Sequence, residues 1–140
     1  MKRNFKKSLL IVCLVLLAAS QKISAQTFSV PQVFTLWDSL VVHHSQILKK
    51  KGFTEVYGGP KKAGGELYLY RNKTAGEYLF IHYTESGKTS NISYYIPTKT
   101  TYLKMKADQG KIKPAENVYF SGVTRYNDGK KYYQVNFKKL

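Results

Sequence analysis

Residues 29–52 read SVPQVFTLWDSLVVHHSQILKKKG, and this stretch organises the fold because its pattern predicts one long amphipathic helix. Its apolar residues recur at spacings of three and four, which places them on one side of a helix with about 3.6 residues per turn. These residues are Val33, Trp37, Leu40, Val41, Ile47 and Leu48. We expect this side, centred on Trp37, to cover the core of the domain.

Both ends of the predicted helix carry sequence signals. Ser29 and Gln32 have the spacing of a capping box, in which each side chain satisfies a backbone group of the first turn. Residues 49–51 are all lysines, which complement the negative end of the helix dipole. Gly52 follows them and can adopt the left-handed conformation that ends many helices. These signals predict a helix that begins near Ser29 and stops at Gly52.

Residues 1–25 have the features of a secretory signal peptide. They combine a basic start with an apolar run at 9–19, and they end on the small residue Ala25. The run is well short of the roughly 20 residues that span a bilayer, so it predicts a cleaved signal rather than an anchor. We expect cleavage after Ala25, with cleavage after Ser20 as the alternative.

The remaining residues, 26–140, are expected to form a single domain that is periplasmic or extracellular and keeps no membrane anchor. Cys13 is the only cysteine and falls within the signal peptide, so the domain cannot rely on disulfides. Val12 precedes it and is too large for a lipidation site, so we expect no lipid there. The domain retains 18 of the 23 Lys and Arg residues against eight acids, a net charge of +10.

Six short runs after the helix predict the strands of an antiparallel sheet, because turn-forming groups separate them. The glycine-rich residues 58–65 predict a loop, and Asn127-Asp128-Gly129 predicts a tight hairpin turn. Residues 98–110 fit either a short helix or a strand, and we favour the helix. The strand-like runs cover residues 53–57, 66–71, 77–84, 89–96, 117–126 and 130–138.

Two diverged copies of a helix followed by hairpins predict the α+β fold class. The first copy contains LYLYRNKTAGEYLFIHY and the second VTRYNDGKKYYQVNF, with similar aromatic spacing around each turn. Together they predict one antiparallel sheet, with the N-terminal helix and the possible short second helix packed on one face. In this layout the chain resembles small exported domains of the beta-lactamase-inhibitor-protein type. The resemblance implies that the open face of the sheet binds another protein.

No motif in the sequence predicts catalysis, a metal site or a cofactor. His43 and His44 are adjacent on the predicted helix, so they point about 100° apart and cannot hold one ion together. We expect His44 to be a partly buried polar residue. Residues 87–89, Gly-Lys-Thr, echo the end of a phosphate loop, but His82 stands where that loop needs a glycine. The eight acids are scattered singly, which disfavours the paired carboxylates of a sugar hydrolase.

The 12 tyrosines all lie in residues 26–140, and many of them separate by strand parity. One parity set is mainly aliphatic and is expected to face the helix. It comprises Leu67, Leu69, Leu79, Ile81, Tyr83, Ile92, Tyr94, Ile96, Tyr133, Val135 and Phe137. The other set is expected to be solvent-exposed on the uncovered side and is the candidate binding face. It comprises Tyr68, Tyr70, Tyr78, Phe80, His82, Tyr95 and Tyr132.

An aromatic surface edged by lysines predicts recognition, since tyrosine adds contact area at low entropic cost and is enriched at interface centres. Tyrosines also suit half-exposed sheets that bind nothing. Our leading interpretation is an exported, non-enzymatic domain that binds a protein partner. The alternative is an anionic envelope polymer or glycan, held by lysines and stacked on tyrosines, and a small hydrolase comes third. Nucleic-acid binding conflicts with export and with the shortage of arginine.

Overall fold

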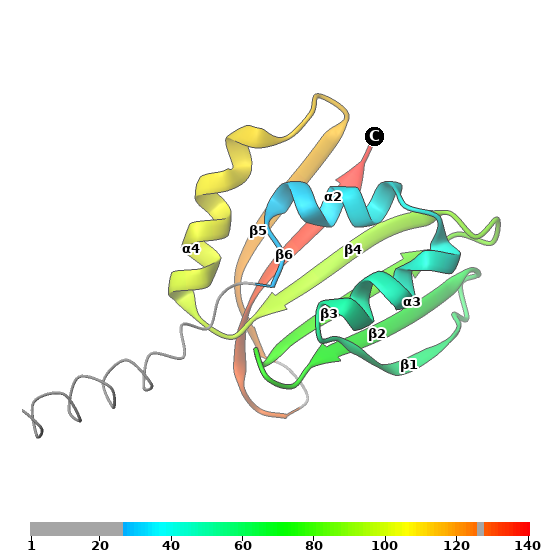
Figure 1. Ribbon diagram of the computed structural model, residues 1–140, viewed down its shortest axis with the longest axis horizontal. Coiled ribbons are helices and arrows are strands. Elements are labelled where there is room, and N and C mark those ends of the chain that lie inside the picture. The colour runs from blue at the N-terminus through cyan, green and yellow to red at the C-terminus, as the bar shows by residue number, and fades with distance from the viewer. Residues whose placement is uncertain (1–26, 126–127) are drawn as a thin grey trace, which may run out of the picture.

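The computed structural model describes residues 27–125 and 128–140, so the predicted signal peptide and Asn127 lie outside the described residues. Six strands form one antiparallel sheet in the order β1-β2-β3-β4-β6-β5, and three α-helices accompany it (Figure 1). The predicted α+β class is therefore confirmed. The elements are α2 (Val30–Asp38), α3 (Val41–Lys50), β1 (Thr54–Pro60), β2 (Glu66–Asn72), β3 (Glu77–Tyr83), β4 (Thr89–Ile96), α4 (Lys99–Ala107), a 3-10 turn η1 (Asp108–Lys111), β5 (Glu116–Arg125) and β6 (Lys131–Lys139).

Most strands coincide with the predicted runs, but β1 continues into the stretch that was expected to be a loop. Gly58 and Gly59 pair with Tyr68 and Leu67 of β2, although glycines at these positions predict irregular structure. Gly58 is needed there because a Cβ atom at that position would collide with the Tyr68 ring. Pro60 ends β1 at the edge of the sheet, where a missing N–H breaks no ladder.

The ambiguous residues 98–110 form a helix, as we favoured. Thr98 caps α4, and its hydroxyl oxygen accepts a hydrogen bond from the Thr101 backbone N–H at 3.3 Å. This bond satisfies one of the donors that a helix start leaves unpaired. None of the helices in residues 27–125 and 128–140 is long and apolar enough to cross a membrane.

The single helix expected over residues 29–52 is wrong, because it breaks at Ser39 into α2 and α3. The backbone of Ser39 is extended, and its hydroxyl donates to the Leu36 carbonyl at 2.7 Å, which competes with continued helix formation. The imidazole of His44 lies across the break, with Nε2 3.2 Å from the Ser39 carbonyl oxygen and Nδ1 2.7 Å from the Tyr83 hydroxyl. The predicted end is confirmed, with Gly52 at a φ of +82°.

The break changes which side chains are buried. Trp37 was expected at the centre of the core, but it is only half-buried, and Phe34 and Leu36 are buried instead. Leu40 and Val41 were also expected to be buried, yet they are 68% and 37% exposed. These residues form the corner between the two helices, where a single straight stripe no longer exists. The prediction of one continuous apolar side is therefore wrong beyond the first helix.

A side chain from each of the three helices contacts a strand residue on one and the same face of the sheet. Phe34 of α2 meets Phe137 with ring centroids 5.5 Å apart, and Tyr102 of α4 lies 5.0 Å from Tyr133. His44 of α3 contacts Tyr83 as described above. Through the strand registers these partners share a face with the buried residues of β3 and β4, which form the core. The other face of the sheet meets none of these helix side chains.

His44 predicts a pH dependence of stability. Burial of the imidazole lowers its pKa below the ordinary 6.5, with backbone hydrogen bonds opposing the shift and His43 adding to it. The unfolded chain therefore takes up a proton near pH 6.5 while the folded protein resists it. We expect the free energy of unfolding to fall as the pH drops below about 6.5, by at most about 1.4 kcal/mol per pH unit from this group. Urea unfolding between pH 8 and pH 4 measures this slope.

Matched variants isolate the contribution of His44. His44→Gln removes the titrating group while keeping a donor and an acceptor, so its pH slope should be shallower than that of the wild type. His43→Gln changes the exposed neighbour and should keep the wild-type slope. The buried carboxyl of Glu77, whose pKa burial raises, works in the opposite direction because its stability contribution is lost as the pH rises. Equal slopes in the His44 variant and the wild type would contradict the assignment.

Candidate functional site

The strand registers bring five of the seven predicted site residues together. Tyr78 pairs with Tyr95, His82 pairs with Asn91, and Phe80 lies between Tyr78 and His82 on the same side of β3. Tyr95 in turn pairs with Gln134, which shares its side of β6 with Tyr132. We call this side of the sheet the open face. Its residues include Tyr57, Leu67, Leu69, Arg71, Tyr78, Phe80, His82, Asn91, Ser93, Tyr95, Asn117, Tyr119, Tyr132, Gln134, Asn136 and Lys138.

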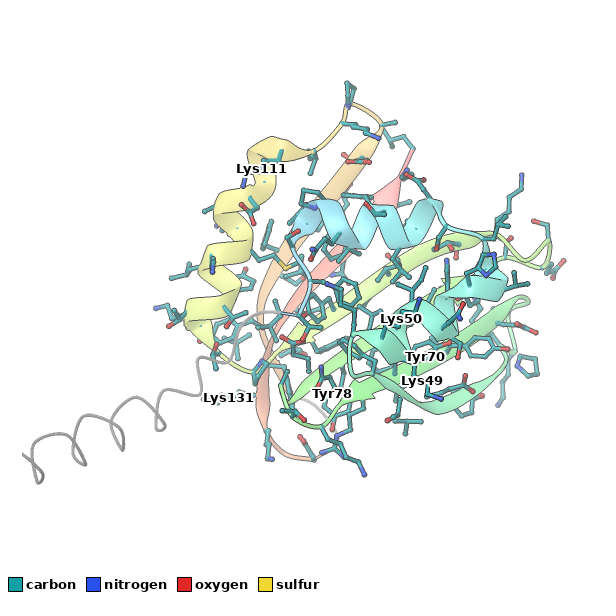
Figure 2. The ribbon with its side chains drawn as sticks, viewed as in Figure 1. Lys49, Lys50, Tyr70, Tyr78, Lys111 and Lys131 are labelled. Carbon is teal, nitrogen blue, oxygen red and sulfur yellow. The ribbon has the colours of Figure 1, made fainter. Side chains whose placement is uncertain are left out.

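Tyr68 and Tyr70 were expected on the open face, but they lie on the opposite, helix-covered face. The four-residue connection 73–76 pairs Asn72 with Glu77, so even-numbered residues of β2 share a face with odd-numbered residues of β3. Tyr70 is only 4% exposed and belongs to the core, and Figure 2 shows it beside α3. The parity prediction for β2 is therefore wrong by one residue.

Leu67 and Leu69 move to the open face for the same reason. Both were expected to contact the helix, but they pair with His82 and Phe80 across β3. Their side chains are half-buried. Two aliphatic residues thus replace two tyrosines on the candidate surface.

Two of the predicted site residues are buried, although the side chains of α2, α3 and α4 named above contact the opposite face. Tyr78 is 6% exposed and Tyr132 is 3% exposed, whereas we expected both to be accessible. Their rings meet edge to face at 5.5 Å, and the Arg71 guanidinium lies 5.3 Å from the Tyr78 ring centre. The Tyr132 hydroxyl donates to Asp128 at 2.9 Å, and burial, followed by that hydrogen bond, raises the pKa of Tyr132. These two tyrosines therefore form a packed end of the face.

The remaining predicted residues are half-buried. Phe80 and Tyr95 contact each other with ring centroids 5.2 Å apart. Burial raises the pKa of Tyr95. Burial also lowers the pKa of His82, and the charge of Lys61 lowers it further. These three side chains keep exposed area and can contact a ligand without rearrangement.

One row of side chains crosses the open face on all six strands. Because neighbouring strands are about 4.8 Å apart, the row is roughly 24 Å long. Its two end residues, Tyr57 and Tyr119, are 51% and 55% exposed. In strand order the row is Tyr57, Leu69, Phe80, Ser93, Asn136 and Tyr119.

A hydrogen-bonded chain of uncharged polar side chains occupies the middle of this row. Asn91 donates to the Ser93 hydroxyl at 3.2 Å, and Ser93 donates to Asn136 Oδ1 at 2.7 Å. Gln134 donates to the same Asn136 oxygen at 2.9 Å, and the Asn136 amide donates to Ser121 at 2.8 Å. Each side chain is thereby held in one orientation. The sequence analysis missed this chain, because neither composition nor alternation signals which polar residues will face one another.

Among the described strands, the open face carries two charged residues. These are Arg71 and Lys138, because the exposed Lys138 lies two residues after Asn136 on β6 and pairs with Asn117. The charge of Lys61 also acts on His82. Other lysines lie elsewhere: Lys49 and Lys50 are on α3, Lys111 ends η1, and Lys131 begins β6 (Figure 2). The aromatic face therefore has lysines on or near it, but many of the lysines lie outside it.

The described residues hold no group of three or more His, Cys, Asp or Glu side chains that could bind a metal ion. His44, the most buried histidine, bridges the helix break and Tyr83 rather than lining the open face. No protein-family model, curated protein or solved structure matches this chain. The geometry of the open face is therefore the basis for assigning a function.

Proposed function

We propose that the protein is an exported, non-enzymatic binding domain whose open face engages a protein partner. The observation that carries this proposal is the row from Tyr57 to Tyr119, which lies opposite the face that α2, α3 and α4 contact and has aromatic and aliphatic side chains around a hydrogen-bonded polar centre. The cores of protein interfaces are enriched in tyrosine, phenylalanine and arginine and depleted in lysine and acids. The open face has much of this composition, with Arg71 and Lys138 as its charged members on the described strands.

The hydrogen-bonded chain of polar side chains also supports a role in recognition. Asn136 and its neighbours are already ordered, so a partner that hydrogen-bonds to them loses little side-chain entropy on binding. Phe80, Tyr95 and the two end tyrosines supply the hydrophobic contact on either side. A polar centre between aromatic rings gives an interface contact area, and its hydrogen-bonding groups fix how the two partners are aligned.

Among the described strands, Lys138 is the one lysine on the open face, and this shortage of lysine disfavours the anionic polymer. A polymer held by lysine charge and tyrosine stacking needs both kinds of side chain on one surface, whereas Lys49 and Lys50 lie on α3, which packs on the opposite face. Polymer binding through lysines should weaken steeply as salt is added, whereas an aromatic protein interface should depend little on salt. Salt dependence therefore separates the two candidates.

We expect the double variant Phe80→Ser, Tyr95→Ser to lose partner capture while staying folded. Aromatic anchors at an interface centre each contribute about 2 kcal/mol or more, which is roughly thirtyfold in Kd, so the Kd of the double variant should rise by roughly several hundredfold. The loss of their cross-strand contacts should cost at most about 1 kcal/mol of stability each. Capture from extracellular and periplasmic extracts, with the partner identified and its Kd measured, provides the test.

The matched control is Lys49→Ser, Lys50→Ser, which changes two exposed side chains on the opposite side of the sheet. This control should capture the partner as the wild type does, at low and high salt alike. Capture that survives in the aromatic variant but fails in the lysine variant would reject the open face and favour the anionic polymer.

A further inference from the structure

The corner between α2 and α3 exposes three consecutive aliphatic residues. Leu40 is 68% exposed, Val41 37% and Val42 79%. Their placement follows from the helix break at Ser39, which turns them outward instead of burying them. Soluble proteins rarely expose large contiguous patches of apolar side chains without a binding role, so we expect this patch to contact a partner.

The corner also forms one wall of an open cleft. The cleft has a volume of about 610 Å³ and lies between the corner and the turn that joins β3 to β4, at Gly87, Lys88 and Thr89. Trp37 lines it and is half-buried, with its ring centroid 6.4 Å from that of Phe34. In Figure 1 the corner and this turn lie at the same end of the molecule.

Exposed lysines lie on α3, the helix that begins at the apolar corner. The ten residues of α3 contain no acid, and Lys49 and Lys50 are exposed in its last turn, at most about 15 Å along the helix from Val41. Asp38 beside the corner pairs with Lys139, and in the nearby turn Glu85 is matched by Lys88. Glu55 and Glu66 are exposed on the side of the sheet that α3 covers, and the hairpin that carries them adds Lys61 and Lys62. The lysines of α3 therefore leave the local charge positive.

We propose that the α2–α3 corner docks on the surface of an anionic membrane. Leu40 and Val42 enter the boundary between headgroups and acyl chains, Trp37 lies at the same interface, and Lys49 and Lys50 face the anionic headgroups. Apolar side chains, an interfacial tryptophan and adjacent lysines are the features of proteins that lie on a bilayer without spanning it. This contact is reversible and needs no anchor.

This surface is separate from the open face. His44 of α3 bonds to Tyr83 on the helix-covered face, so α3 and the open face are on opposite sides of the sheet. A membrane-docked molecule would present its open face away from the bilayer. The inference therefore does not depend on the proposed partner binding, and either one can fail alone.

Trp37 is the only tryptophan of the chain, so its fluorescence reports on this corner and not on the apolar run near the N-terminus. We expect its emission to shift to shorter wavelength with phosphatidylglycerol vesicles and to remain unchanged with phosphatidylcholine vesicles. The double variant Leu40→Asp, Val42→Asp should partition at least about tenfold more weakly, since each exposed side chain loses its apolar transfer energy. Lys49→Gln, Lys50→Gln should weaken binding roughly tenfold or more.

The control is Leu103→Asp, Val123→Asp, which adds the same charge at aliphatic residues that are 50% and 54% exposed elsewhere. It should bind vesicles far more tightly than the corner variant. Three results would overturn the proposal: no emission shift with anionic vesicles, equal binding to neutral ones, or equal weakening by both aspartate pairs. A shift that depends on protein concentration without vesicles would also overturn it, because it would make a second copy the occupant.

Discussion

Replacing Tyr70 with alanine is expected to lower the free energy of unfolding by about 3–5 kcal/mol, as for other large aromatic side chains in cores. Tyr70 is 4% exposed and belongs to the core cluster, with its ring stacked 6.5 Å from that of Tyr68. Alanine would leave a cavity in the core beside Tyr68. Urea unfolding at neutral pH measures the loss.

Tyr95→Ala is the matched comparison, because it removes the same side chain from the open face. Tyr95 is half-buried and contacts Phe80, so its loss should cost about 1 kcal/mol or less. A second measurement checks the placement of Tyr70 in the wild type: burial raises its pKa to about 12, so its phenol should titrate later than an ordinary tyrosine. Equal destabilisation by the two substitutions would contradict the assigned register of β2.

Replacing Phe34 with alanine is also expected to lower the free energy of unfolding by about 3–5 kcal/mol. Phe34 is 2% exposed and joins α2 to the sheet through an edge-to-face contact with Phe137 at 5.5 Å. Domains of this size have total stabilities of about 5–15 kcal/mol, so the variant should be largely or partly unfolded at elevated temperature. Thermal unfolding followed by circular dichroism tests this expectation.

Trp37→Ala provides the contrast for Phe34. Although Trp37 is larger, it is half-buried and lines an open cleft, so we expect its removal to cost only about 1 kcal/mol. The sequence pattern predicts the opposite order, with Trp37 as the centre of the core. A greater loss of stability for Trp37→Ala than for Phe34→Ala would show that the break at Ser39 does not turn the tryptophan outward.

Local signals predicted much of the secondary structure. The turn residues marked the ends of β2, β3 and β4, and Gly52 ended α3 as expected. These features depend on interactions within a few residues, which a sequence displays directly. The signal peptide at residues 1–25 stays a prediction, because it lies outside the described residues.

The candidate site was predicted only in part, because the face of the sheet on which a side chain lies depends on how its strand pairs with its neighbours. Within one strand, alternation separated the two faces correctly: Tyr78, Phe80 and His82 do share a side of β3. Between β2 and β3, the offset of the connection 73–76 decided that Tyr68 and Tyr70 face the helices. A shift of one residue moves every side chain of a strand to the other face.

By itself the sequence determined the α+β class, the antiparallel meander and the positions of most turns, since each follows from short-range periodicity and backbone preferences. Only the tertiary structure decided which residues form the core and which form the open face. The break at Ser39 is held by His44, 5 positions away, which in turn bonds to Tyr83, 39 positions further on, and it exposes Leu40 and Val42 while burying Phe34. Such contacts join distant segments, so their effect on burial cannot be read from any local pattern.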